Sequence, residues 1–164
     1  MATQNLSQYG DVPDASALKI CLVVADWNSD VTYAMKEAAM QTLREHGVKE
    51  DNIVTRHVPG SFELSSGAQM MAHNISMIDA IICIGCVIRG ETPHFDYICQ
   101  GVAYGLTKIS IEYSIPVIFG VLTTNDLQQA LDRSGGKHGN KGVEAAVTAI
   151  KMAAIKSDFR DSWF

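Results

Sequence analysis

Four short apolar runs set the strongest limit on how this chain can fold. Runs of this length are typical of strands that are buried on both faces of a sheet. Each run is followed by a polar loop and then by a segment in which apolar residues recur at helical spacing. Strands that alternate with helices form a parallel sheet, because each parallel connection crosses the sheet through a helix. The predicted strands are residues 18–25, 53–58, 80–84 and 116–122.

The segments between the runs also carry signals for helix starts. Ser29 or Asp30 is predicted to cap the first helix. Ser61, with an acidic residue in the following turn, is predicted to cap the second. The remaining helices are predicted at residues 95–113, after the capping sequence 123–126, and at 143–158.

This order of elements, β-α-β-α-β-α-β-α-α, predicts the fold class. It is typical of a flavodoxin-like, three-layer α/β/α domain with a four-stranded parallel sheet. Residues 1–17 are polar and contain Pro13, so we expect an extended N-terminal arm. Residues 18–164 are expected to form a single domain.

Composition argues against several classes of partner. With 164 residues, 47% hydrophobic and 19% charged, the chain is expected to be a globular soluble protein. The apolar content indicates either buried subunit interfaces or a large core. A net charge of -5 without a basic run argues against nucleic acid and an anionic membrane. No apolar run approaches the length of a membrane span.

Cys83 and Cys86 form a CxxC pattern, which occurs in redox and zinc sites. We favour buried hydrophobic cysteines instead, because Cys83 lies within a predicted strand and no second CxxC exists. Reduced thiols indicate the cytosol. The first ten residues lack the basic and apolar regions of a signal peptide. A cytoplasmic protein is therefore expected.

The loop after the third run is the first candidate site. Open parallel sheets bind ligands at the carboxyl ends of their strands. Backbone amides of residues 90–92 could face an anion there, helped by the positive end of the following helix. His94, at the start of that helix, could exchange a proton near neutral pH. The pattern predicts an anion site with a proton-transfer residue.

Two other features leave alternatives open. Residues 133–142 combine glycines with basic side chains, which suits either a second anion site or a flexible linker. Glu63 could bind a hydroxyl group or simply complement a helix dipole. The sequence contains neither GxGxxG nor GxxxxGK[ST], so it does not support the usual dinucleotide and nucleotide sites.

Four motifs, in order, resemble the lumazine synthase family of riboflavin biosynthesis. The resemblance extends from about Lys19 to Ile155. The motifs are HVPGSFEL (57–64), GCVIRGETPHFDYI (85–98), PVIFGVLTT (116–124) and RSGGKHGNKG (133–142).

The resemblance implies a condensation that needs no metal and no organic cofactor. The amine of 5-amino-6-(D-ribitylamino)uracil attacks the ketone of 3,4-dihydroxy-2-butanone 4-phosphate. A Schiff base forms, phosphate leaves, and ring closure gives 6,7-dimethyl-8-ribityllumazine. Riboflavin synthase is the implied functional partner. A riboflavin synthase of the same fold, or a non-catalytic flavin-binding or shell protein, remains the alternative.

The resemblance also implies roles for particular residues. His94 would transfer protons, and Arg133 would pair with the phosphate. Glu91 stands where many members have a small residue, so its carboxylate would have to point away from the phosphate. His57, His73 and His138 are expected to be surface or structural residues. The implied substrate-binding residues are Trp27, Asn28, Ser61, Phe62, Glu63, Val87, Ile88, Glu91, Thr92, Phe119 and Lys141.

The resemblance further implies a homo-oligomer. The family forms pentamers, and in some members twelve pentamers close into a sixty-subunit shell. Phe119, Arg133 and Lys141 would reach the site from the adjacent subunit. Residues 135–139 form a short connection, whereas members confined to pentamers often have a longer one there. We therefore expect the shell.

Overall fold

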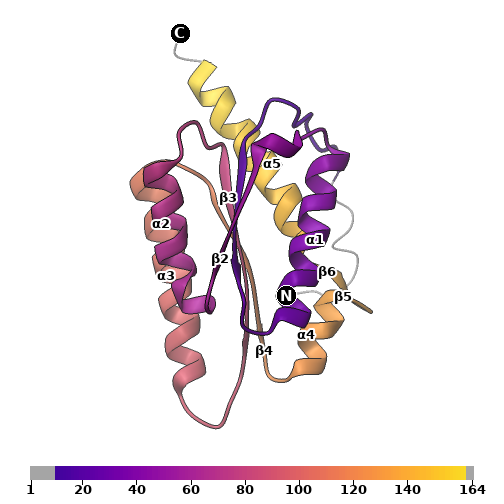
Figure 1. Cartoon of the computed structure of the whole chain (residues 1–164), viewed down its shortest axis with the longest axis vertical. Coiled ribbons are helices and arrows are strands. Elements are labelled where there is room, and N and C mark those ends of the chain that lie inside the picture. Colours follow the sequence, from indigo (N-terminus) through magenta and orange to yellow (C-terminus); the bar gives the residue numbers. More distant parts are fainter. Residues whose placement is uncertain (1–9, 162–164) are drawn as a thin grey trace.

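A four-stranded parallel sheet forms the centre of the structure, a computed structural model that describes residues 10–161. The strand order is β2-β1-β3-β4, and every neighbouring pair is parallel. Figure 1 shows the sheet almost edge-on between two layers of helices. The predicted three-layer, flavodoxin-like fold is confirmed. The strands are β1 (Ile20–Ala25), β2 (Ile53–Val58), β3 (Ala80–Ile88) and β4 (Val117–Thr124).

The helices divide between the two faces of the sheet. In Figure 1, α2 and α3 cover one face, and α1, α4 and α5 lie on the other. Two short 3-10 helices, η1 (Glu50–Asn52) and η2 (Ser61–Glu63), flank β2, and a small hairpin joins α4 to α5. The helices are α1 (Ser29–Glu45), α2 (Leu64–Asn74), α3 (His94–Tyr113), α4 (Leu127–Arg133) and α5 (Lys141–Asp161), and the hairpin strands are β5 (Ser134–Gly136) and β6 (Gly139–Asn140).

Alternating side chains of the strands form one core on each side of the sheet. In β1, Leu22 and Val24 pack with α1 and α5, whereas Cys21 and Val23 pack with α2 and α3. All six residues of β1 are fully buried, as the continuous apolar run predicts. Each fully buried Leu or Val contributes about 1.5–3 kcal/mol to folding. Two cores therefore hold the central strands in place.

The same alternation settles the CxxC pattern. Cys83 belongs to the core beneath α2 and α3, and Cys86 to the core beneath α1 and α5. Residues three apart in a strand point to opposite faces, so these two sulfur atoms cannot share a disulfide or a metal. Burial raises the pKa of Cys86 to about 11 and that of Cys83 further still. The interpretation as buried hydrophobic cysteines agrees with the structure.

Two of the predicted strands end too early by a few residues. Strand β3 continues through Gly85 to Ile88, because Gly85 pairs with Val121 of β4. A Cβ on Gly85 would lie 2.6 Å from Ser61 Oγ, so the glycine permits close packing and does not end the strand. Strand β4 likewise runs on to Thr124.

Asn28, and neither Ser29 nor Asp30, occupies the N-cap of α1. Its backbone is left-handed, with φ 59°, and its carbonyl accepts from the N–H groups of Val31 and Thr32. Asparagine tolerates this conformation better than most residues. Its side chain makes no cap hydrogen bond and is free to serve elsewhere.

Part of the predicted N-terminal arm packs on the domain. Ala15 is fully buried, and its N–H donates to the carbonyl of His46 at the end of α1, at 3.0 Å. Residues 1–9 of the arm and the tail residues 162–164 lie outside the described residues. The boundary at residue 17 stays a prediction.

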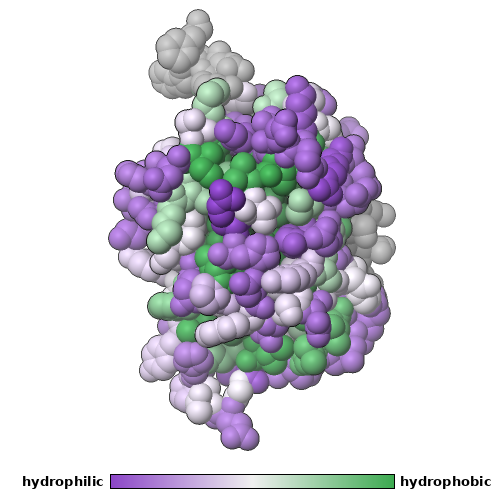
Figure 2. All heavy atoms as spheres, viewed as in Figure 1, coloured by the Kyte–Doolittle hydropathy of each residue, from purple (hydrophilic) through white to green (hydrophobic). Residues whose placement is uncertain are grey.

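The described surface mixes polar and apolar areas. Figure 2 shows that apolar atoms on the face in front form separate small areas between polar side chains. Within residues 10–161, no helix has both the length and the apolar character needed to cross a bilayer.

Candidate active site

The carboxyl ends of all four strands meet at one edge of the sheet. Figure 1 shows this edge at the lower end of the view, where α1, α3 and α4 begin. The segments that carry Trp27, Glu63 and His94 follow β1, β2 and β3 at this edge, and β4 ends there at Thr124. Their position agrees with the rule that open parallel sheets bind ligands at this edge.

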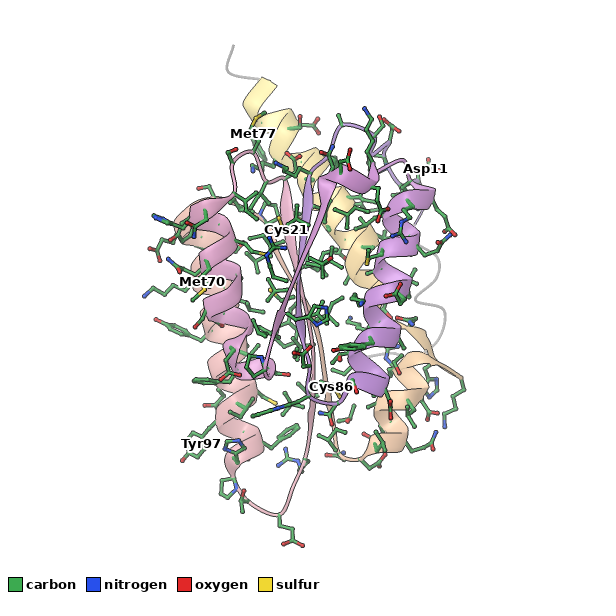
Figure 3. All side chains as sticks on the ribbon, viewed as in Figure 1. Asp11, Cys21, Met70, Met77, Cys86 and Tyr97 are labelled. Carbon is green, nitrogen blue, oxygen red and sulfur yellow. The ribbon has the colours of Figure 1, made fainter. Side chains whose placement is uncertain are left out.

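The carbonyl of Cys86 joins two of these loops to β3. Asn28 Nδ2 donates to it at 3.0 Å, and Ser61 Oγ donates at 3.3 Å. Cys86, labelled in Figure 3, lies near the carboxyl end of the sheet. Both side chains were predicted to bind substrate, and the structure places them side by side. Sequence patterns did not indicate the shared carbonyl, because it lies 58 residues from Asn28 and 25 from Ser61.

Trp27 and Glu63 meet at Gly60. A Cβ on Gly60 would lie 2.5 Å from Trp27 Cε3 and 3.2 Å from Glu63 Oε2, so only glycine lets both side chains approach. The N–H of Gly60 donates to Glu63 Oε2 at 3.1 Å. Trp27 remains 68% exposed and can offer its indole face to a ligand. Gly60 is therefore part of the candidate site.

The remaining predicted residues of these strands and loops lie close by. Phe62 is exposed and borders α3, where a Cβ on Gly101 would lie 3.0 Å from its ring. Val87 and Ile88 are the last residues of β3, paired with Thr123 and Thr124 of β4. Because β3 runs further than predicted, their backbone groups form the rim of the site.

His94 is the first residue of α3 and is exposed to solvent. Glu91 and Thr92 precede it in an exposed loop, beside the free N–H groups that begin every helix. The positive end of α3 and these amides suit an anion. The start of α3 therefore has the exposed histidine and the backbone amides that the sequence predicts for an anion site.

Arg89 braces the same loop. Its backbone N–H donates to the carbonyl of Thr124 at 2.8 Å. Its guanidinium lies 4.1 Å from the centre of the Phe95 ring and 3.1 Å from Asp96 Oδ1. Phe95 and Asp96 directly follow His94 in the first turn of α3, so Arg89 links the end of β3 to the start of this helix. Sequence reasoning gave Arg89 no role.

The residues described so far, among them Trp27, Asn28, Ser61, Glu63 and His94, are called the first group. Phe119, Arg133 and Lys141 form a second group that lies away from it. Phe119 pairs with Cys83 in the middle of the sheet, five residues before the level of Ile88. At the rise of a β-strand this is about 17 Å. Phe119 and Lys141 instead line an open pocket of about 410 Å³ beside the edge strand β4, together with Glu144 and Met152. One chain does not bring the two groups together.

Glu144 organises the second group. Its Oε1 accepts from Arg133 Nη2 at 3.0 Å, and its Oε2 from Lys141 Nζ at 2.9 Å. Arg133 also donates to the carbonyl of His138 at 3.3 Å. Two cations beside one carboxylate leave an excess positive charge, which suits an anionic ligand. The spacing of Lys141 and Glu144 on a helix was the only sequence signal for this arrangement.

The glycine-rich run from residue 133 to 142 is a small hairpin, so the flexible-linker alternative is wrong. Asn140 Nδ2 donates to the carbonyl of Ala34 at 3.3 Å and to that of Ser134 at 2.9 Å. Lys137 pairs with Asp132 Oδ2 at 3.0 Å. Hydrogen bonds from Gln128, and then from Lys137, lower the pKa of Asp132. The hairpin holds Arg133 and Lys141 at its two ends.

No group of three or more histidine, cysteine, aspartate or glutamate side chains among residues 10–161 is arranged to hold a metal ion. The candidate site combines an exposed aromatic ring, hydrogen-bonding side chains and the N-terminal end of a helix, which suits an anion. A second, cationic group lies on the same chain.

Fold and site together define a flavodoxin-like α/β protein with a candidate ligand site at the carboxyl edge of its sheet. The family model described as 6,7-dimethyl-8-ribityllumazine synthase matches residues 17–157. The chain belongs to this family, as the motifs predict.

Similar proteins cover nearly the whole chain. A 6,7-dimethyl-8-ribityllumazine synthase of Parabacteroides distasonis is 56% identical over 153 residues, which are 92% of this chain and 95% of that protein. The enzyme of the same name from Porphyromonas gingivalis is 53% identical, over 94% of this chain and 97% of its own length. That of Bacteroides fragilis is 56% identical over 82% of this chain and 94% of its own.

Proposed function

We propose that this chain is a lumazine synthase of riboflavin biosynthesis. It condenses 5-amino-6-(D-ribitylamino)uracil with 3,4-dihydroxy-2-butanone 4-phosphate to 6,7-dimethyl-8-ribityllumazine and releases phosphate. The observation that carries the proposal is that Asn28 and Ser61 share the carbonyl of Cys86 and that Trp27 and Glu63 meet at Gly60, at the sheet edge where α3 also begins. Membership of the family supports it.

The ribitylaminouracil binds to the residues of the first group. The exposed face of Trp27 stacks on the pyrimidine ring, and the backbone of Val87 and Ile88 at the end of β3 bonds to its polar edge. Glu63 uses Oε2 to hold the N–H of Gly60 and keeps its other oxygen for ribityl hydroxyls. Ser61, Phe62 and Asn28 complete the ribityl site.

The phosphate of the second substrate lies at the start of α3. Amides of Glu91 and Thr92 donate to it, and Arg133 of an adjacent subunit neutralises it. Glu91 is exposed, so its carboxylate can turn to solvent. Phe119 and Lys141 of that adjacent subunit close the site.

The reaction joins two substrates that the site holds close together, and its steps require proton transfers. The amine adds to the ketone and water leaves, which forms the Schiff base. Loss of phosphate and ring closure with loss of a second water then give the lumazine. His94, beside the phosphate, moves protons in these steps. Positioning of the two substrates supplies much of the acceleration.

Phe119 lies about 17 Å from the level of Ile88 along the sheet of one chain, which supports a site completed by a neighbouring subunit. Exposed apolar side chains favour association. Tyr97, Tyr104 and Ile111 are 72%, 73% and 76% exposed and recur every seven residues on α3, so they form a stripe on one side of the helix. Figure 3 shows Tyr97 projecting from α3 away from the sheet.

We propose a pentamer, and a sixty-subunit shell because the hairpin between α4 and α5 is short. The protein works in the cytoplasm, and a riboflavin synthase consumes its product. Light scattering of the purified protein measures the assembly. A mass of about sixty chains supports the shell, and a mass of about five chains contradicts it.

A fluorescence assay with the two substrates tests the activity. Lumazine emission and phosphate release faster than in a protein-free control are expected. Riboflavin formed from added lumazine would favour the alternative riboflavin synthase. An assembled protein that does not accelerate the condensation would favour a flavin-binding or shell protein.

A His94→Ala variant tests the proton-transfer role. We expect a slower but measurable reaction, because proton transfer contributes a factor of about 10²–10⁴ and positioning remains. Wild-type steady-state kinetics in this variant would contradict the assignment. His73→Gln, on the exposed surface of α2, is the control and should match the wild type.

A further inference from the structure

A hydrogen-bonded cluster lies directly next to Trp27 and uses none of the residues assigned above. Asp26 Oδ1 is 2.6 Å from His57 Nδ1 and accepts from the Tyr33 hydroxyl at 2.8 Å. The rings of Tyr33 and His57 meet edge to face, with centroids 5.3 Å apart and an angle of 88°. The three side chains thus touch one another in pairs.

The cluster joins three separate elements. Asp26 follows the last residue of β1, His57 lies in β2, and Tyr33 lies in α1. Lys36 extends it, because its Nζ lies 5.0 Å from the centre of the Tyr33 ring. Hydrogen bonds from His57, and then from Tyr33, lower the pKa of Asp26. Both bonds therefore favour the charged carboxylate.

The cluster acts on the short loop that presents Trp27. The N–H of Asp26 donates to the carbonyl of Val58 at 2.8 Å, and the N–H of Trp27 to that of Pro59 at 3.0 Å. Those bonds attach the loop to the end of β2 alone. The Tyr33 hydroxyl adds a bond to α1, on the opposite side of the loop. Immediately after Trp27, Asn28 adopts a left-handed backbone that needs support from its surroundings.

We propose that Asp26, His57 and Tyr33 form a positioning cluster that holds Trp27 ready to stack on the pyrimidine ring. The inference rests on the proposed function of Trp27. A ring that is already fixed loses less conformational freedom when the substrate binds. The cluster therefore lowers KM for ribitylaminouracil and has little effect on the phosphorylated substrate.

Tyr33→Phe is the main test, because it removes one hydroxyl and keeps the ring. His57→Ala and His57→Gln form a second pair, in which the glutamine amide can still donate to Asp26. All variants carry Trp163→Phe, which leaves Trp27 as the single tryptophan, since the sequence has two. The readouts are acrylamide quenching of Trp27 fluorescence and steady-state kinetics with each substrate varied.

The loss of the hydroxyl should make Trp27 easier to quench. KM for ribitylaminouracil should rise about three- to tenfold, whereas KM for butanone phosphate and kcat should stay within about twofold. His57→Ala should act in the same direction, and His57→Gln should restore part of the effect. Unchanged quenching and unchanged KM in Tyr33→Phe would overturn the inference.

Tyr113→Phe is the matched control. It removes a hydroxyl that accepts from Gln69 Nε2 at 2.9 Å, at the far end of α3. Equal effects of Tyr113→Phe and Tyr33→Phe would show a general loss of packing and overturn the inference. Failure of the proposed function has a different signature, because the wild-type protein would then not form lumazine. Trp27 quenching would still test the cluster in that case.

Discussion

Arg133 and Lys137 lie in the same glycine-rich segment and carry the same charge, but their surroundings differ. The Arg133 side chain is 19% exposed and is held by Glu144, whereas the Lys137 side chain is 66% exposed. A partly buried, well-oriented guanidinium can bind phosphate strongly. An exposed lysine paired with Asp132 contributes little, as surface ion pairs do.

Arg133→Ala should therefore impair use of the phosphorylated substrate. A charge-assisted hydrogen bond contributes about 1.5–3 kcal/mol, so KM for butanone phosphate should rise about 10- to 100-fold. KM for ribitylaminouracil should change far less. Steady-state kinetics with each substrate varied would check this.

Lys137→Ala is the control, with both KM values expected to stay within about twofold of wild type. An equal rise in KM for butanone phosphate in both variants would mean that only the total charge of the segment matters. Arg133 would then have no specific contact with the phosphate.

The pKa of Asp26 gives a pH dependence with a definite sign. An aspartate whose pKa is lowered by folding stabilises the protein above its unfolded pKa of about 3.9. That contribution is lost as the pH falls through the lowered, folded value. Urea unfolding of wild type and Asp26→Asn from about pH 5 to about pH 3 should show a stability difference that shrinks with falling pH. A difference that stays constant over this range would contradict the assignment.

Single residues were predictable where the signal is local. Asp126 was expected in a capping sequence, and its Oδ1 accepts from the N–H of Gln129 at 2.8 Å. Glu144 and Gly60 were missed as site residues, because their roles depend on groups that the fold brings near them. The resemblance supplied the site residues, and the structure gives contacts for several of them, such as Asn28, Glu63 and Arg133.

Among the elements, α1 and α5 are in close backbone contact at Gly142. A Cβ there would collide with the carbonyl oxygen of Met35 and lie 2.7 Å from its carbonyl carbon. Backbone atoms of a helix cannot turn aside as a flexible side chain can. Gly142 therefore fixes the position from which α5 presents Lys141 and Glu144.

Gly142→Ala should destabilise the protein by about 1–3 kcal/mol or more, as overpacking does. It should also reduce activity, because Lys141 and Glu144 move with the helix. Urea unfolding monitored by circular dichroism would measure the stability. Gly90→Ala is the control for stability, since a Cβ there has no neighbour within 4 Å and should change it by less than about 0.5 kcal/mol.

The sequence predicted the type and order of the helices and strands better than it predicted the residues at which they end. Strand β2 was predicted with its correct bounds. Strand β3 was cut short at Gly85, because a glycine after an apolar run usually marks a turn. Pairing with β4 determines where β3 ends, and that pairing is not visible in a local pattern.

For the whole molecule, the separation of the two groups predicts complementation between subunits. A subunit with His94→Ala still offers an intact second group, and one with Arg133→Ala still offers an intact first group. Mixed and reassembled at equal amounts, the two variants should give about one quarter of the wild-type sites. Lumazine formation should then exceed the mean of the separate variants.

The control mixes His94→Ala with Glu63→Ala. Both changes damage the first group, so no arrangement of these subunits restores it, and activity should stay at the mean. A gain in this control, or none in the first mixture, would contradict a site shared between subunits.

The four apolar runs predict the overall architecture. They do not predict that the site residues fall into two separate groups on one chain. Phe119 is in a predicted strand and Arg133 in a loop motif, and neither position indicates the distance to Trp27. Only the sheet register shows that Phe119 lies five residues before the level of Ile88. The involvement of a second subunit came from the resemblance.

The stripe of Tyr97, Tyr104 and Ile111 on α3 has a consequence for protein production. If the proposed assembly covers this stripe, a chain that has just left the ribosome carries it uncovered until it meets other subunits. During that interval it competes with aggregation, because exposed apolar surface associates without selectivity. The yield of native protein in a cell would then depend on how quickly new chains encounter one another. Slow expression at low temperature would favour capture by the correct partner over loss to inclusion bodies.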